Sequence, residues 1–316
     1  MIDGDDLDLF ERSLRAATER HTGEALDTAL DELGWRDALS FDTRAAVSRL
    51  FELQGEAAAT SSALDHVLAF AIGRELDGST SILLPAIGRW EAPGHVEQGR
   101  VTVHGFATAS RPSTMLVAHD ADADADMAFR VGTAEFDVRS VRGVDPGLGL
   151  VEMRGELDAI DAEPVAWSDA VSLGQIVLAH ELVGASRQAL ALAREHALER
   201  VQFGQPIARF QAVRHRLAEA LVALETASAV LDAAWLDRTP VTAAMAKATA
   251  GRSGRTVARH CQQVLAGIGF TNEHDLHRYV RRILVLDQLF GSHTTLTKRL
   301  GDEVRTTRTL PRLLPL

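Results

Sequence analysis

Apolar residues recur every three or four positions over roughly residues 5–77, which predicts a set of amphipathic helices. Asp42 and the pair Ser61-Ser62 precede two of the apolar stripes and are suited to begin helices. Gly78-Ser79-Thr80 then breaks the helical period. The predicted apolar faces consist of Leu7, Phe10, Leu14 and Ala17, then of Ala46, Val47, Leu50, Phe51 and Leu53, and then of Leu64, Val67, Leu68 and Ala71.

Short runs rich in β-branched residues, separated by Gly and Pro, replace this pattern between about residues 80 and 165. Residues 100–104 alternate polar and apolar side chains with period two, and this spacing predicts an antiparallel β unit. The acidic run 120–126 is predicted to be a solvated hairpin loop, and a metal site there is the less favoured alternative. Similar short runs cover residues 81–84, 114–118 and 136–141.

Long helical stretches return between about residues 168 and 305 and predict a bundle of antiparallel helices. Pro240 is placed near the start of one helix, where a missing N–H is tolerated, and Gly267-Ile268-Gly269 ends that helix. The chain is therefore predicted to be mainly α with a β insert. We expect helices over residues 171–196, 210–236, 240–265 and 276–289, and a short one after residue 292.

Composition narrows the class of protein without identifying a ligand. The 33 Lys and Arg residues against 44 Asp and Glu give a net charge of −11, which argues against a general binder of nucleic acid or anionic membranes. Cys261 is the single cysteine, so it forms no internal disulfide and no cysteine-built zinc site. No apolar run reaches the roughly 18 residues that span a bilayer, and the acidic start is unlike a signal peptide. We expect a cytoplasmic protein without a membrane span.

The strongest local motif is the turn Arg200-Val-Gln-Phe-Gly-Gln-Pro-Ile-Ala-Arg-Phe-Gln211, between two predicted helices. A guanidinium at a helix end, such as that of Arg200, suits a phosphate or pyrophosphate group. Phe203 offers a flat face, and the amide of Gln211 offers both a donor and an acceptor. Alternatively, this is an ordinary turn whose arginine pairs with a nearby carboxylate.

A second motif runs Gln263-Val-Leu-Ala-Gly-Ile-Gly-Phe-Thr-Asn-Glu273. Gly267 and Gly269 allow a sharp turn or the close approach of another group to the backbone. A glycine pair after a helix is by itself commonly a helix C-cap. It ends a helix instead of joining a strand to one, so it is not a Rossmann fingerprint.

Taken together, the two motifs resemble those of the acyl-CoA dehydrogenase family. The resemblance is best over about residues 170–300, looser over 30–80 and poor in the β region. It implies an N-terminal helical region, a small antiparallel β domain and a C-terminal four-helix bundle. On this basis we expect a truncated N-terminal helical domain at 1–79, a β domain at 80–166 and the bundle at 167–316.

The resemblance also implies a cofactor site. In that family the two motifs bind the adenosine and pyrophosphate end of an FAD that is seated mainly in a neighbouring subunit. The role would fall to Arg200, Phe203, Gln211, Gln263 and Gly267. Where the family usually has Gly-Gly-x-Gly, this chain begins the turn with Ala266, whose methyl group would crowd the FAD.

The catalytic glutamate of the family is missing. The family removes two hydrogens from an acyl-CoA thioester, and a glutamate takes the α proton. Gly291 falls at the usual position of that glutamate, and Gly174 or Gln175 falls at the alternative position on the first bundle helix. The nearest acids are Asp287, for which an ion pair with Arg281 or Arg282 is the favoured role, and Glu181, an expected helix-packing or interfacial acid.

The loop that holds the flavin ring in the family is also missing. The nearest stretch, residues 84–93, lacks its Thr-Glu-Pro and Gly-Ser-Asp elements. Trp90 lies in this stretch and is expected to be a core residue, with stacking on an aromatic ring as the alternative. In lacking the glutamate and the flavin loop, the chain resembles the short subunit of actinobacterial α2β2 acyl-CoA dehydrogenases. Several of these enzymes act on CoA-activated steroid side chains.

Three hypotheses follow from the sequence. In the first, the chain is the subunit without the glutamate in a heteromeric, FAD-dependent acyl-CoA dehydrogenase. In the second, it is a homomeric acyl-CoA dehydrogenase with an unusual base, for which Asp287 is the candidate. In the third, it is a flavin-free scaffold of the same fold.

Overall fold

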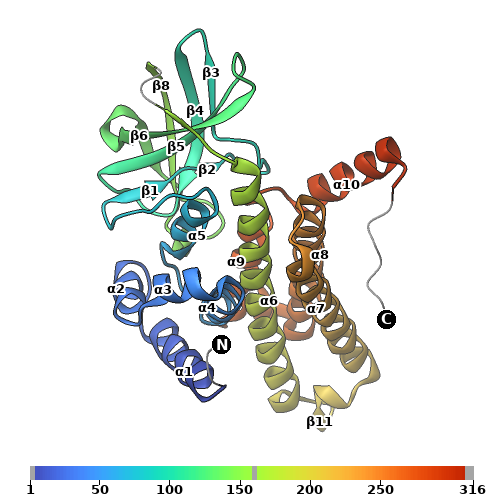
Figure 1. Cartoon of the computed structure of the whole chain (residues 1–316). Coiled ribbons are helices and arrows are strands. Elements are labelled where there is room, and N and C mark those ends of the chain that lie inside the picture. The colour runs from blue at the N-terminus through green and yellow to red at the C-terminus, as the bar shows by residue number, and fades with distance from the viewer. Residues whose placement is uncertain (1–3, 159–161, 310–316) are drawn as a thin grey trace.

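A computed structural model describes residues 4–158 and 162–309, and Figure 1 shows their arrangement. A group of helices and a β sheet lie beside the long helix α6, and the remaining helices form a bundle with it. Among the described residues, no helix combines the length and the hydropathy that a bilayer span requires.

The first helical group contains all three predicted helices and two that the sequence pattern did not reveal. Asp42 caps its helix as predicted, because its Oδ1 accepts a hydrogen bond of 2.9 Å from the N–H of Ala45. The pattern missed α2 and α3, two short helices that begin after glycines with positive φ, Gly23 and Gly34. The elements are α1 (Gly4–Arg20), α2 (Glu24–Glu32), α3 (Trp35–Phe41), α4 (Thr43–Ala57) and α5 (Ala63–Ala71).

In the described residues nine strands form one sheet. Seven of them follow the order β7-β8-β4-β3-β5-β6-β9, and β1 and β2 lie off this path. Most pairings are antiparallel, as predicted, but β1 and β3 both pair with β5 in parallel. The acidic run 120–126 forms the turn between β5 and β6, as expected for a hairpin loop. The strands are β1 (Thr80–Ile82), β2 (Leu84–Pro85), β3 (Gly94–Glu97), β4 (Arg100–Ala107), β5 (Ser113–Asp120), β6 (Ala125–Gly132), β7 (Asp137–Ser140), β8 (Val151–Asp158) and β9 (Glu163–Pro164).

The bundle is built around α6, which is buried along most of its first half. Pro240 occupies the first turn of α8, as predicted. The helix α9 ends earlier than the predicted Leu289, and α10 is longer than the short helix expected after Ser292. The elements are α6 (Trp167–Glu199), a hairpin of β10 (Val201–Gln202) and β11 (Gln205–Pro206), α7 (Gln211–Asp237), α8 (Pro240–Leu265), α9 (Leu276–Leu286) and α10 (His293–Thr307).

Two glycines let α4 lie against α6 at backbone distance. A Cβ atom on Gly184 would come within 2.0 Å of the carbonyl oxygen of Glu52, and one on Gly55 within 2.3 Å of the carbonyl oxygen of Glu181. Neither contact leaves room for a methyl group. Because α4 and α5 pack directly on α6, the divisions after residues 79 and 166 stay a prediction.

Candidate functional site

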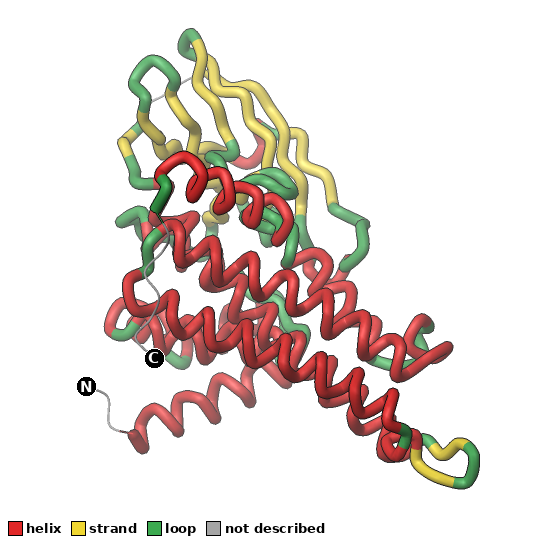
Figure 2. The backbone as a smooth tube through the Cα atoms, turned by 90° about the vertical axis from the view of Figure 1, so that its right-hand side faces the viewer, coloured by secondary structure: helices red, strands yellow, loops and turns green. Residues whose placement is uncertain are grey.

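The arginine turn forms a hairpin that projects from the end of the bundle, as the tube in Figure 2 shows. Arg200 follows the last residue of α6 in an extended conformation. Phe203 and Gly204 form the tip of the hairpin with φ angles of 53° and 77°. The Phe203 ring is 93% exposed and meets Phe210 edge to face, at 6.1 Å between ring centroids. The chain therefore presents a large aromatic face to the outside.

The helix after this turn begins without a side-chain cap. Gln211 is its first residue, and Phe210 at the N-cap position has no side-chain acceptor. Its carbonyl accepts the N–H groups of Val213 and Arg214, so the N–H groups before them have no capping side chain. Such free donors, at the positive end of the helix dipole, suit an anion. Among residues 4–158 and 162–309, Arg200 makes no ion pair, so the alternative of an ion-paired turn is not found.

The glycine turn follows α8 in a short 3₁₀ helix over Ala266–Phe270. Gln263 and Gly267 are exposed, and the space around a Cβ atom on Gly267 is open. Ala266 has φ 53° and ψ −132°, a region that favours glycine. The backbone of Ala266 therefore has a conformation that is typical of glycine.

Two histidines connect the motifs at this end of the bundle. His196, one turn before Arg200, accepts the Arg200 N–H through its carbonyl at 2.9 Å. Its ring meets the ring of His274, which follows the glycine turn, at 6.1 Å and nearly perpendicular. Partial burial, together with the neighbouring charges of His274 and Arg200, lowers the pKa of His196. The structure therefore brings residues that flank the two motifs into contact with each other.

The donors at this place fit the phosphate end of a dinucleotide. They comprise a guanidinium, the uncapped start of α7 and the exposed amides of Gln211 and Gln263. Phe203 and Phe270, which is 71% exposed, offer faces for an aromatic base. The sequence patterns assigned no role to His196, His274 or Phe270, although Phe270 lies within the second motif, His274 directly follows it and His196 lies just before the first motif.

The first position expected for the catalytic glutamate is closed by hydrophobic side chains. Gly291 has φ 93°, and a Cβ atom there would lie 2.8 Å from Cε3 of Trp90 and 2.9 Å from Cδ2 of Leu296. Trp90 is held in place because its carbonyl accepts a hydrogen bond of 3.1 Å from Nε1 of Trp167. Arg299 lies over its ring at 5.2 Å. No carboxylate fits at residue 291 without displacing Trp90.

The second position is closed in the same way. A Cβ atom on Gly174 would lie 2.9 Å from Cδ2 of Leu68 and 3.4 Å from Cζ of Phe290. Gln175 beside it is buried, and its Nε2 donates a hydrogen bond of 3.1 Å to the carbonyl of Phe290. This side chain is engaged in holding the turn before α10.

Asp287 is a structural acid with both oxygens engaged. Oδ2 accepts Nε of Arg255 at 2.7 Å, and Oδ1 accepts the N–H of His293 at 2.9 Å. The predicted partners were wrong, because Arg255 on α8 takes the place of Arg281 and Arg282. Burial raises the pKa of Asp287, but the charge of the buried Lys247 and the hydrogen bonds from Arg255 and His293 outweigh burial and lower it.

Glu181 lies in the helix packing. Its Oε1 is 3.1 Å from Nη1 of Arg282, whose Nε is 2.6 Å from Oδ2 of Asp145. Burial raises the pKa of Glu181, although the charge of Arg282 opposes that change. Arg282 also donates to the carbonyl of Ala59 at 2.7 Å, so the cluster ties α6 and α9 to the end of α4.

Residues 84–93, the stretch nearest to the missing flavin loop, join the sheet to the bundle. Leu83 and Leu84 are fully buried, and the N–H of Gly88 donates to the carbonyl of Gln288 at 2.9 Å. A cavity of about 490 Å³ lies beside Trp90 and Trp167, between the sheet and the start of α6. The carboxylates in its wall are those of Glu91 and Asp126, neither of which is at a glutamate position, and Gln175 of the second position also lines it.

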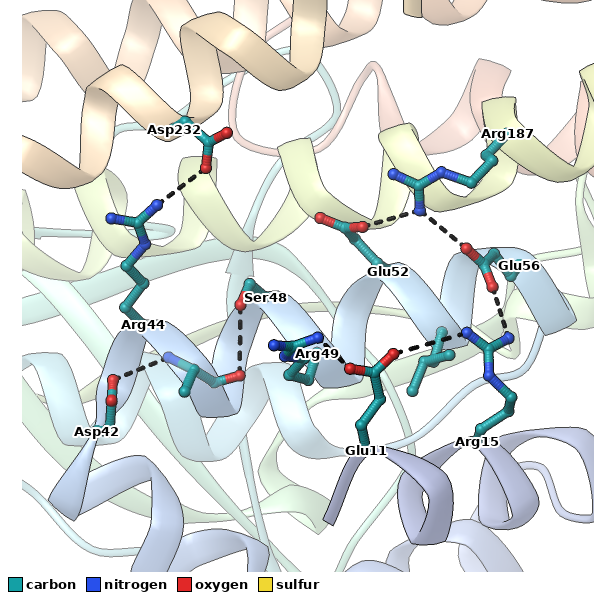
Figure 3. A pocket seen from close by; sticks show the side chains of 12 residues that line it. Glu11, Arg15, Asp42, Arg44, Ser48, Arg49, Glu52, Glu56, Arg187 and Asp232 are labelled. Carbon is teal, nitrogen blue, oxygen red and sulfur yellow. Dashed lines mark hydrogen bonds and ion pairs between the residues drawn. The ribbon is translucent and has the colours of Figure 1, made fainter. Parts of the chain in front are cut away.

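A separate groove lies between α1, α4, α6 and α7, and Figure 3 shows the side chains that line it. Its charges neutralise one another. Arg187 pairs with Glu52 and Glu56, each at 2.8 Å, and Arg44 pairs with Asp232 at 2.9 Å. We interpret this groove as an ion-pair seam between the first helices and the bundle. The described residues contain no cluster of three or more His, Cys, Asp or Glu side chains that could hold a metal ion.

The C-terminal part of the chain matches a known protein family. Residues 167–304 match the family model described as the acyl-CoA dehydrogenase C-terminal domain. The acyl-CoA dehydrogenase IpdE2 of Mycobacterium tuberculosis is 36% identical over 170 residues, which cover 54% of this chain and 52% of that protein. The acyl-CoA dehydrogenase FadE34 of the same organism is 37% identical over 155 residues, 47% of this chain and 22% of that protein. The matched region thus spans about half or less of these relatives.

Two solved structures share the whole fold. The Tcur3481-Tcur3483 steroid acyl-CoA dehydrogenase has a TM-score of 0.79 at 20% identity, over 96% of this chain and 99% of that one. The ChsE4-ChsE5 complex from Mycobacterium tuberculosis has a TM-score of 0.77 at 18% identity, over 99% of both chains. At these identities the likeness concerns the fold alone.

Proposed function

We propose that this chain is the subunit of an FAD-dependent acyl-CoA dehydrogenase that lacks the catalytic glutamate and supplies the adenosine and pyrophosphate half-site to a neighbouring subunit. One contrast carries the proposal. Gly291 and Gly174 are enclosed by hydrophobic side chains and Gln175 is an amide that already donates to the Phe290 carbonyl, whereas the turn that carries Arg200 and Phe203 is exposed.

In this proposal the flavin supplies the hydride acceptor, and the residues of this chain bind and orient the far end of the cofactor. Arg200 and the first N–H groups of α7 neutralise the phosphates, and Phe203 contacts the adenosine. Gln211 and Gln263 supply amide hydrogen bonds, and Gly267 leaves room for the close approach of the ligand. Removal of the α proton is left to the partner subunit.

We infer that the partner is a second acyl-CoA dehydrogenase subunit and that the assembly is heteromeric. Support comes from the names of the structures with the same fold, a steroid acyl-CoA dehydrogenase and a complex of two different chains. An acyl-CoA thioester, in particular a CoA ester of a steroid side chain, is the proposed substrate. The cytoplasm remains the expected compartment.

The geometry favours this proposal over a homomeric enzyme that uses Asp287 as the base. Both Asp287 oxygens accept hydrogen bonds, and its pKa is lowered, so it is a poor acceptor for a substrate proton. The scaffold alternative leaves the exposed Arg200 and Phe203 without a purpose.

The test is co-purification with the acyl-CoA dehydrogenase encoded beside this chain. We expect a yellow complex whose FAD content falls at least tenfold in Arg200→Ala. Arg194→Ala is the matched control, because Arg194 is exposed one and a half turns earlier on the same helix. The proposal is overturned if this chain alone retains FAD and oxidises acyl-CoA as fast as the complex.

A further inference from the structure

The N–H of Leu276 at the start of α9 is satisfied by an imidazole. Leu276 is fully buried, and its N–H is one of those that find no partner within the helix. Nδ1 of His274 accepts this N–H at 3.1 Å. The carbonyl of His274 accepts Nδ1 of His277 at 2.9 Å. His274 therefore fixes the direction in which the chain leaves the glycine turn and enters α9.

The same imidazole reaches across to α6. The rings of His274 and His196 are 6.1 Å apart at an interplanar angle of 89°, an edge-to-face arrangement. His196 in turn holds the N–H of Arg200 at 2.9 Å through its carbonyl. A chain of contacts thus runs from the glycine turn through two rings to the residue that carries the guanidinium.

We propose that His274 is a positioning residue of the cofactor half-site, which sets the glycine turn against Arg200 through its contact with His196. This inference rests on the proposed function, because it concerns the same half-site. The two motifs follow α6 and α8, which pack directly against each other, and contacts at the ends of these helices add to that packing in setting the separation of the two turns. The His196–His274 pair is such a contact.

The side-chain contacts make distinct contributions that substitutions can separate. His274→Asn keeps a side-chain acceptor for the Leu276 N–H but removes the ring, because asparagine forms this type of local bond readily. His196→Ala removes the same ring contact from the other side. His274→Ala removes both the acceptor and the ring.

The experiment measures FAD affinity of the purified complex after its FAD has been removed and added back, with the quenching of flavin fluorescence as the readout. We expect His274→Asn and His196→Ala each to weaken FAD binding by about three- to tenfold, the range expected for an aromatic pair. The double variant His274→Asn/His196→Ala is expected to bind FAD no more weakly than either single variant, because both substitutions remove the same ring contact. His274→Ala is expected to bind FAD most weakly, and His274→Asn is expected to recover part of the lost FAD affinity.

His21→Ala is the matched control, since His21 is an exposed histidine just after α1. The inference is overturned if the losses of the two single variants multiply in the double variant, or if His274→Ala binds FAD as tightly as the unaltered complex. A failure of the proposed function itself gives a different result, because Arg200→Ala would in that case also leave FAD affinity unchanged. Thermal melting of each complex verifies that the variants are folded.

Discussion

Ala266 holds a backbone conformation that costs an L-residue about 1–3 kcal/mol. Because glycine adopts φ 53° and ψ −132° without this strain, Ala266→Gly is expected to raise the free energy of unfolding by about 1 kcal/mol. Urea denaturation measures the change. Ala218→Gly in the exposed face of α7 is the control and is expected to lower stability by about as much. A loss of stability in Ala266→Gly would contradict the assignment of strain.

Asp65 makes stability depend on pH. It is 1% exposed, its Oδ2 accepts the hydroxyl of Thr108 at 3.0 Å, and its Oδ1 has no partner in the described part of the chain. Burial raises its pKa from 3.8 to about 7. Between these two values the folded state binds more protons than the unfolded state, so the free energy of unfolding falls as pH rises and then levels off above about pH 7.

We expect Asp65→Asn to gain stability over the unaltered protein at pH 8, about 4 kcal/mol at most, and to gain little at pH 4. The amide carries no charge, so its burial does not depend on pH. Thermal melting of both proteins from pH 4 to pH 8 measures the difference. A difference in melting temperature that stays constant over this range would contradict the raised pKa.

Local patterns predicted the residues that act through their own segment. The Asp42 cap, the placement of Pro240 and the exposed turn after α6 follow from capping and turn chemistry. Contacts between distant segments were not predictable. Arg255 as the partner of Asp287 and Trp90 as the side chain that closes the space at Gly291 depend on how the helices meet in space.

At the scale of elements, the α4–α6 contact depends on glycine. Gly184→Ala places a Cβ atom against the Glu52 carbonyl, which belongs to the backbone and cannot rotate away. We expect a loss of roughly 1–3 kcal/mol in the free energy of unfolding. Gly301→Ala is the matched control, because the space around Gly301 on α10 is open, and it should gain about 0.5–1 kcal/mol. Chemical denaturation compares the two variants, and equal effects would exclude close packing at Gly184.

The long helices were predictable because their apolar period runs over many turns. The short α2 and α3 were missed because glycines interrupt the pattern every few residues. The parallel pairings of β5 with β1 and β3 were also missed, since period-two alternation identifies a strand but does not reveal its neighbours.

At the scale of the whole molecule, the glutamate position at Gly174 and the arginine turn lie toward opposite ends of α6 (Figure 1). Gly174 lies near its start and Arg200 at its end, roughly 40 Å apart at the rise of an α-helix. In the heteromeric assembly that we propose, each FAD takes its ring site from the partner and its adenosine site from this chain. We expect one FAD per pair of unlike subunits, measured from flavin absorbance and total protein. Two FAD per pair would show that this chain holds a ring site of its own.

The closed glutamate positions predict that catalysis cannot be restored in this chain by one substitution. In Gly291→Glu the new side chain meets Trp90 and Leu296, so overpacking is expected to lower the stability of the complex by roughly 1–3 kcal/mol. The double variant Trp90→Ala/Gly291→Glu removes the contact with Trp90 but keeps the contacts with Leu296 and the positive φ of residue 291, so no more than part of the stability should return. Activity per FAD should stay unchanged in both variants, because residues 84–93 still form a strand and a sheet-to-bundle connection and leave the ring unsupported. A rise in activity per FAD in the double variant would mean that the cavity beside Trp90 already holds a flavin ring.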